Sequence, residues 1–193
     1  MRICVYGAAS PTISTTYMEK VEVLGKLIAS HKHSFVFGGG GNGLMGAVAR
    51  GVHSLGGYIV GVVPKFFSDE SIEKVCDFCD ELIEPETMRE RKQIMEDKSD
   101  AFIIVPGGIG TFEEFFEILT LKQLCRHNKP IVIYNIDGYY DEINQAMEQA
   151  VQKGFIRSDC LDLFETTDDL DKLFKYIEEP CVQIKTVKEL KNG

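Results

Sequence analysis

The chain has 193 residues, enough for one α/β domain with a full hydrophobic core and short for two. Its 30 acidic and 21 basic residues give a net charge of −9, so most of its surface would repel a nucleic-acid backbone. The apolar stretch from Ile3 to Ala9 is too short for a signal sequence or a membrane span. We therefore expect one domain, residues 1–193, in a cytoplasmic protein with no nucleic-acid or membrane partner.

Five apolar runs have the length and composition of buried parallel strands, at residues 3–6, 34–37, 58–63, 101–105 and 131–134. Segments with the apolar spacing of amphipathic helices follow them, at residues 17–29, 43–55, 85–98, 111–125 and 139–153. This alternation predicts an α/β fold: a doubly wound, Rossmann-like parallel sheet with helices on both faces, and a ligand site beyond the carboxyl ends of the strands. From about residue 161 we expect a peripheral tail with one short strand and a helix at residues 168–177.

The cysteines and histidines show no metal pattern. The six cysteines contain one close pair, Cys76 and Cys79, and the acidic residues beside it would raise the thiol pKa rather than activate a redox thiol. The histidines form no pair at helical i, i+4 spacing and have no acidic partner at metal-site spacing: His31, His33, His53 and His127. We expect no disulfide framework and no metal ion.

A first glycine-rich loop, residues 38–46, directly follows the second predicted strand and opens a helix. Glycines let a backbone approach a ligand, and a helix start presents unpaired N–H groups to an anion. The alternative is a tight strand-to-helix turn without a ligand. Candidate ligand contacts in this loop are Gly39, Gly40, Gly43 and Met45.

Residues 41–46 match the dinucleotide fingerprint G-x-G-x-x-G, but its usual context is missing. That fingerprint expects an acidic residue about 20 positions on, to bind the ribose hydroxyls. The chain has no acidic residue between Glu22 and Asp69, which argues against NAD and leaves only NADP, through Lys65. The same stretch holds four basic residues and so favours a small anionic ligand: Lys26, Lys32, Arg50 and Lys65.

A second glycine-rich loop, residues 106–111, joins the fourth predicted strand to a helix, and a phosphate could bind there to N–H groups and the Thr111 hydroxyl. Thr111 and Glu114 also match a helix capping box, which would give Glu114 a purely structural role. The basic cluster at residues 88–92 could be a solvated helix face. It could also direct Arg91 and Lys92, about 100° apart on a helix, to one pocket.

Residues 106–114, Pro-Gly-Gly-Ile-Gly-Thr-Phe-Glu-Glu, resemble the PGGxGTxxE motif of the Lonely Guy (LOG) family, formerly labelled possible lysine decarboxylases. Residues 88–92, Met-Arg-Glu-Arg-Lys, resemble its M-H-x-R-K segment. The resemblance includes the first glycine loop and Asp137-Gly138-Tyr139-Tyr140, and it spans residues 2–156 with the tail outside it. Two departures concern base preference: Arg89 replaces a common His, and residues 6–10 replace a C-G-S-S loop.

The resemblance implies a Rossmann-like, usually dimeric protein that releases a free base and ribose 5-phosphate from a nucleoside 5′-monophosphate, typically a cytokinin nucleotide or AMP, without a cofactor. Arg91 and Glu114 then resemble the catalytic pair. The implied substrate contacts are Met88, Lys92, Gly107, Gly108, Ile109, Gly110, Thr111, Glu113 and Thr120. Glu73 is the candidate for a further acidic contact in a stretch, residues 64–88, that is longer than in common members.

The chemistry of that reaction fits these residue types. Cleavage of an N-glycosidic bond builds positive charge on the ribose, which a carboxylate such as Glu114 can stabilise. Arg91 suits charge stabilisation and orientation, because a guanidinium is a poor proton donor. Two alternatives are a nucleotide carrier without turnover and a decarboxylase, which would need pyridoxal phosphate and a Schiff-base lysine that the sequence does not single out.

The helix predicted at residues 111–125 is apolar around most of its circumference, so it must be buried on several sides. One domain of this size seldom covers a helix fully, so we expect a homodimer that buries part of it. The alternative is a central helix packed on the sheet alone.

Overall fold

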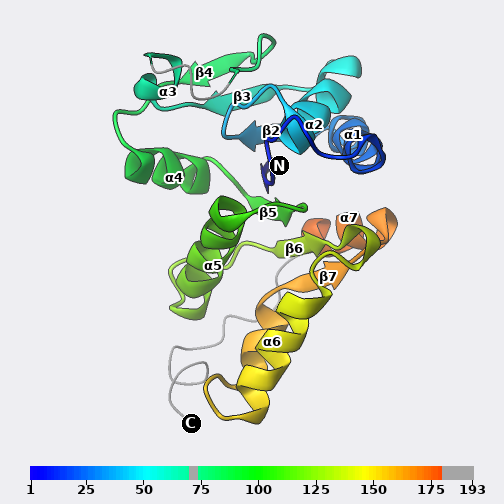
Figure 1. Ribbon diagram of the computed structural model, residues 1–193, viewed down its shortest axis with the longest axis vertical. Helices are drawn as coiled ribbons and strands as arrows, with labels where there is room; N and C mark the ends of the chain where they lie inside the picture. The colour runs from blue at the N-terminus through cyan, green and yellow to red at the C-terminus, as the bar shows by residue number, and fades with distance from the viewer. Residues whose placement is uncertain (70–73, 180–193) are drawn as a thin grey trace.

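The computed structural model describes residues 1–69 and 74–179, so Glu73 lies outside the described residues. In this part of the chain one sheet of seven parallel strands has the order β4-β3-β2-β1-β5-β6-β7 (Figure 1). The chain runs outward from β1 in one direction and then, from β5, in the other. The doubly wound α/β fold predicted from the sequence is therefore confirmed.

The strands are β1 (Arg2–Tyr6), β2 (Ser34–Phe37), β3 (Ile59–Val62), β4 (Glu81–Ile83), β5 (Ala101–Ile104), β6 (Ile131–Tyr134) and β7 (Glu165–Thr167). The α-helices are α1 (Thr15–Ser30), α2 (Gly43–Ser54), α3 (Lys65–Asp69), α4 (Met88–Asp97), α5 (Ile109–Gln123), α6 (Asp141–Gln152) and α7 (Leu170–Glu178). Two short 3₁₀ segments are η1 (Ile136–Gly138) and η2 (Ser158–Leu163). No helix among the described residues is both long enough and apolar enough to cross a membrane.

The strands form the middle layer of three because their side chains alternate between two apolar cores. Helices α1, α2 and α7 cover one face, where Leu24 and Phe174 pack with Phe35 of β2. Helices α4 and α5 cover the other face, where Met95 and Phe115 pack against the strands. Figure 1 shows α1 and α2 beside the blue-to-cyan strands and α5 beside β5.

The five strands and five helices expected before residue 154 are all present, with small shifts at their ends. The helix expected from residue 85 begins at Met88, because Thr87 caps it. The Thr87 hydroxyl accepts from Glu90 N at 3.1 Å, and the Glu90 carboxylate accepts from Thr87 N at 3.3 Å. Helix α3 and strand β4 were not expected, since neither is long enough to show a period.

The short strand and the helix expected after residue 161 are confirmed as β7 and α7. The expectation that this segment is peripheral is wrong for residues 161–179, because both elements pack with the rest of the domain. Strand β7 pairs with β6, and α7 starts at Leu170, capped by the Asp169 carboxylate. Three side chains of α7 are buried in the core: Leu173, Phe174 and Ile177. Their spacing is that of one apolar helix face, which has to be covered by the sheet.

Candidate functional site

Both glycine loops and helix α4 meet at the carboxyl ends of β1, β2 and β5, around a cavity of about 290 Å³. This is the place that the doubly wound topology predicts for a ligand. Of the residues proposed from the sequence, seven line the cavity: Gly40, Met45, Arg91, Gly108, Gly110, Thr111 and Glu114. The proposed catalytic pair, which is 23 positions apart in the chain, therefore shares one cavity.

Arg91 reaches the cavity from the first turn of α4 and is held by backbone acceptors. Its Nε donates to the Val62 carbonyl at 3.1 Å, and one terminal nitrogen donates to the Gly38 carbonyl at 3.4 Å. The guanidinium also lies over the Phe67 ring, 5.6 Å from its centroid. A guanidinium has five N–H donors, so N–H groups remain for an anionic ligand.

Gly38 makes this position of Arg91 possible. A Cβ atom at residue 38 would overlap the Arg91 guanidinium, so only glycine allows the approach. Neither Gly38 nor Phe67 was proposed from the sequence as a site residue. Gly38 belongs to the first glycine-rich loop, so the sequence pattern could have identified it. Phe67 lies on α3, which shows no periodic pattern in the sequence.

Glu114 faces Arg91 from the second turn of α5 and is partly buried. Burial raises the pKa of its carboxyl to about 7; the Arg91 charge lowers it, and Glu113 raises it. The carboxyl is thus close to half ionised at neutral pH. A carboxyl group with a raised pKa in a cavity, beside a fixed guanidinium, is typical of catalytic sites.

The capping-box interpretation of Glu114 is wrong. Helix α5 begins at Ile109 with Gly108 as N-cap, and no side chain bonds to this helix start. Thr111 is the third residue of the helix and is buried, so Thr111 and Glu114 both lie inside the helix. Without a side-chain cap, N–H groups of the first turn are left for a ligand.

The start of α2, in the first glycine loop, is arranged differently. The N–H groups of Leu44 and Met45 donate to the Ala8 carbonyl, at 2.9 and 3.4 Å, so they are already paired. Gly43 has a φ of +56°, and a Cβ there would lie 2.6–2.8 Å from the backbone of residues 8–10. Gly39, with a φ of +78°, packs against Val63. Neither Gly39 nor Gly43 lines the cavity.

Lys92 points away from the cavity toward the outer side of α5. Its Nζ lies 2.5 Å from Glu113 and 2.7 Å from Glu117. Burial lowers the pKa of Lys92, but the hydrogen bonds that Lys92 donates to both glutamates, together with their charges, raise it more. The remaining proposed contacts also lie outside this cavity wall: Met88, Gly107, Ile109, Glu113 and Thr120.

A second cavity of about 270 Å³ adjoins the first, and Ala8 and Gly108 line both. Gly107 borders it, with Tyr17 and Tyr139, whose hydroxyl donates to the Gly107 carbonyl at 2.6 Å. Its wall is mostly apolar, whereas the first cavity carries Arg91 and Glu114. Together the two cavities can accept a ligand with one anionic and one flat, apolar part.

A family model described as possible lysine decarboxylase matches residues 45–177. The cytokinin riboside 5′-monophosphate phosphoribohydrolase LOG2 of Arabidopsis thaliana is 35% identical over 178 residues, which cover 92% of this chain and 83% of that protein. The probable phosphoribohydrolase LOG6 of the same plant is 37% identical over 183 residues, covering 95% and 90%. The chain belongs to the LOG family. The expectation that the resemblance ends before the tail is wrong, because the family match runs to residue 177.

Solved structures agree with the fold of this LOG-family chain. A molybdenum cofactor binding protein from Rippkaea orientalis superposes with a TM-score of 0.69 at 21% identity, covering 92% of this chain and 94% of that one. The Moco carrier protein of Chlamydomonas reinhardtii gives 0.66 at 21% identity, covering 90% and 93%. At this level of identity the likeness shows the fold alone.

Proposed function

We propose that this LOG-family protein hydrolyses the N-glycosidic bond of a nucleoside 5′-monophosphate and releases the free base and ribose 5-phosphate. The observation that carries the proposal is Glu114 beside Arg91 at the uncapped start of α5, in one cavity. The relatives with 35–37% identity are named for cytokinin riboside 5′-monophosphates. We extend that substrate class, with AMP included, to this chain.

The geometry suggests a division of labour around the ribose. The α5 start, the Thr111 hydroxyl and the free N–H groups of Arg91 offer donors to the 5′-phosphate. Anchoring the phosphate fixes the anomeric carbon relative to Glu114. The ionised Glu114 carboxylate then stabilises the positive charge that develops on the ribose ring and orients the attacking water.

The adjoining apolar cavity is the proposed place for the base. Tyr17 and Tyr139 offer aromatic faces there, next to Ala8 and Gly108, which border both cavities. Ala8 belongs to the loop that departs from the family pattern, residues 6–10. We therefore place base preference in this loop and the reaction itself in the Arg91–Glu114 pair.

The test is incubation of the purified protein with AMP and with N6-isopentenyl-AMP, with free base and ribose 5-phosphate measured by chromatography. We expect product from at least one substrate and a loss of kcat on the order of 10³-fold in Glu114→Gln. The matched control is Glu142→Gln, which removes an exposed carboxylate of α6. Full activity in Glu114→Gln, or nucleotide binding without product in the native protein, would refute the proposal.

The two alternatives have weaker support. The carrier hypothesis rests on solved structures about 21% identical, which share the fold alone. A decarboxylase would need a neutral lysine to form a Schiff base with pyridoxal phosphate. No lysine lines the cavity within the described part of the chain, and Lys92, the nearest in sequence to Arg91, is ion-paired with a raised pKa.

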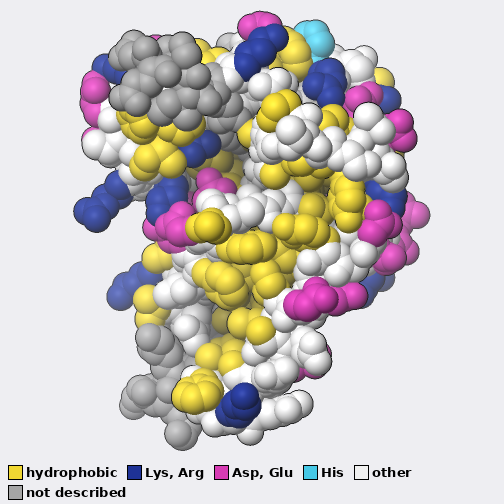
Figure 2. Space-filling model, viewed as in Figure 1, with side chains coloured by type: hydrophobic (Ala, Val, Ile, Leu, Met, Phe, Trp, Pro, Cys, Tyr) yellow, Lys and Arg dark blue, Asp and Glu magenta, His cyan; other side chains and the backbone are white. Residues whose placement is uncertain are grey.

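We further propose that the protein is a cytoplasmic homodimer that uses one face of α5. Phe116 is 39% exposed and Ile109 87% exposed on this helix. Figure 2 shows hydrophobic side chains gathered across the middle of the face that it presents. Cys4, Cys76 and Cys79 are free thiols, as in reducing compartments. Light scattering after size exclusion should give twice the 21.7 kDa chain mass, and Phe116→Asp should halve it.

A further inference from the structure

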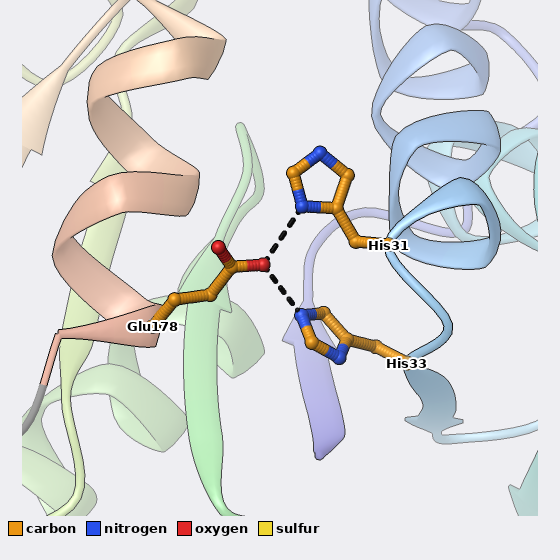
Figure 3. A group of neighbouring side chains, drawn as sticks. All are labelled: His31, His33 and Glu178. Carbon is orange, nitrogen blue, oxygen red and sulfur yellow. Dashed lines mark hydrogen bonds and ion pairs between the residues drawn. The ribbon is translucent and has the colours of Figure 1, made fainter.

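Three side chains from distant parts of the sequence meet near the amino end of strand β2. His31 ends α1, His33 directly precedes β2, and Glu178 is the last residue of α7. His31 Nδ1 lies 2.7 Å and His33 Nε2 2.8 Å from the same oxygen, Oε1, of Glu178 (Figure 3). One donor atom from each of the three residues lies within 4.8 Å of the others.

The backbone and one aromatic ring hold the two imidazoles in place. Lys32, between the histidines, has a φ of +61°, in the left-handed region, where the chain turns from α1 into β2. His31 stacks on Phe174 of α7, with ring centroids 4.4 Å apart, and His33 lies 6.4 Å from the same ring. Figure 3 shows both rings directed at Glu178, so little reorganisation separates this arrangement from a ligand set.

Two imidazole nitrogens and one carboxylate oxygen form a donor set that proteins use for zinc. Bonds of about 2.0–2.2 Å in a tetrahedral site place such donors about 3.3 Å apart. The two distances to Glu178 are therefore about 0.5 Å shorter than a zinc site needs. The side chains of His31 and Glu178 are both 37% exposed, so small rotations can open this gap and an ion can enter from solution.

We propose that His31, His33 and Glu178 bind one divalent ion of the zinc class, with water as the fourth ligand. The ion fastens α7 to the junction of α1 and β2. The hydrolytic site lies at the other end of β2, beyond Phe37, so the ion takes no part in that reaction. The inference is independent of the proposed function and revises the expectation of no metal, which considered sequence spacing without Glu178.

The test uses the full chain, stripped of metal by a chelator, at about pH 7.5, where imidazole is mostly neutral. Calorimetric titration with Zn²⁺ should show one ion per chain, and saturating Zn²⁺ should raise the Tm by several degrees. Glu178→Gln and His31→Gln should each weaken Zn²⁺ binding at least tenfold and abolish the rise in Tm. His53→Gln, which removes an exposed imidazole of α2, should behave like the native chain.

Thiols are the competing ligands, since Cys76 and Cys79 lie close to each other. The titration is therefore repeated in Cys76→Ser/Cys79→Ser, and with Co²⁺, whose absorption reports thiolate ligands by charge transfer. Binding that is lost in the serine variant, unchanged in Glu178→Gln, or absent at 100 µM Zn²⁺ overturns the proposal. Phosphoribohydrolase activity should be equal in the native chain and Glu178→Gln, so the two proposals fail separately.

Discussion

The two glycine loops look alike in sequence and differ in what their helix starts do. Both follow a buried strand, and both open a helix without a side-chain cap. At α2, the N–H groups of Leu44 and Met45 are already bonded to the Ala8 carbonyl. The start of α5 has no side-chain cap, and its residues Gly108, Gly110 and Thr111 line the cavity together with Gly38, Gly40 and Met45 of the first loop. The N–H groups at the start of α2 are therefore occupied by Ala8, whereas the start of α5 is available to a ligand.

Glycine has a different structural role in each of the two loops. In the first loop, glycine permits close packing of backbone on backbone and lets Arg91 reach Gly38. In the second, a Cβ at Gly108 or Gly110 would meet no atom within 4 Å. Glycine content alone cannot separate these roles, because the decisive fact is whether the N–H groups already have partners.

Arg91 is hydrogen-bonded to the first loop and shares the cavity with the second, so its replacement should have the largest effect among the changes that follow. Arg91→Lys keeps the charge but loses the planar fork that is held by the Val62 and Gly38 carbonyls. We expect kcat/KM for the nucleotide to fall about 10²-fold with little change in Tm. Steady-state kinetics beside a thermal melt measure both. A value within threefold of the native one would show that charge alone suffices there.

Much of the fold was predictable because buried parallel strands are continuous apolar runs. The run at residues 131–134 coincides with β6, and the alternation of strands and helices predicted the doubly wound sheet. Strand β4 was missed because only three residues at the sheet edge form it, with no buried residue among them. The capping box Thr87–Glu90 was readable in the sequence and would have placed the start of α4 correctly.

Two glycine variants test the contrast between the loops directly. Gly43→Ala forces a Cβ onto the backbone of residues 8–10 at a positive φ, so we expect a loss of stability of about 1–3 kcal/mol. Gly110→Ala places its methyl in open space at the cavity wall, where it competes with the ligand. We expect KM to rise about tenfold, with an unchanged or higher Tm, since alanine favours helix.

The contrast between the two helix starts would be refuted if Gly43→Ala raised KM and Gly110→Ala lowered stability. A Gly43→Ala protein with native Tm and a raised KM would mean that the start of α2 also contributes to ligand binding. Denaturant unfolding and steady-state kinetics on the same preparations decide this. Gly56→Ala is a useful reference, because it also has a positive φ but no atom near its Cβ, so it reports backbone strain without packing.

The candidate site was only partly predictable from the sequence. Arg91, Thr111 and Glu114 were identified and do line one cavity. Lys92 lies next to Arg91, yet it faces Glu113 and Glu117, because one helical step of about 100° turns it away from the cavity. Contacts such as that of Ala8 with the α2 start depend on tertiary packing and leave no local pattern.

The pH dependence of the rate sharpens the role given to the second loop. If ionised Glu114 is required, kcat/KM should fall about tenfold per pH unit below its pKa of about 7 and level off above it. The substrate phosphate titrates near pH 6, so a limb centred there would report the phosphate instead. Activity that declines above pH 7 would assign Glu114 the role of proton donor.

The Glu114 carboxyl group should also have a smaller effect, on the free energy of unfolding. The pKa of Glu114 is raised from 4.5 to about 7 on folding, so the folded chain binds more protons between these values. The stability it contributes is complete below about pH 4.5 and is lost as the pH rises through about 7. Glutamine does not titrate, so its contribution to stability does not change with pH. Glu114→Gln should therefore be more stable than the native chain at pH 8 by about 1–2 kcal/mol, which is less than the full pKa shift would give because Glu114 is partly exposed.

The same comparison at pH 4 should show almost no difference, and Glu142→Gln should show none at either pH, because its carboxylate is exposed. Urea unfolding at both pH values measures this. A helix cap would give the opposite sign, since removing a charged cap at a helix start destabilises the chain at neutral pH. Greater stability with lost turnover would mean that the chain holds a destabilising carboxylate at this position for its chemistry.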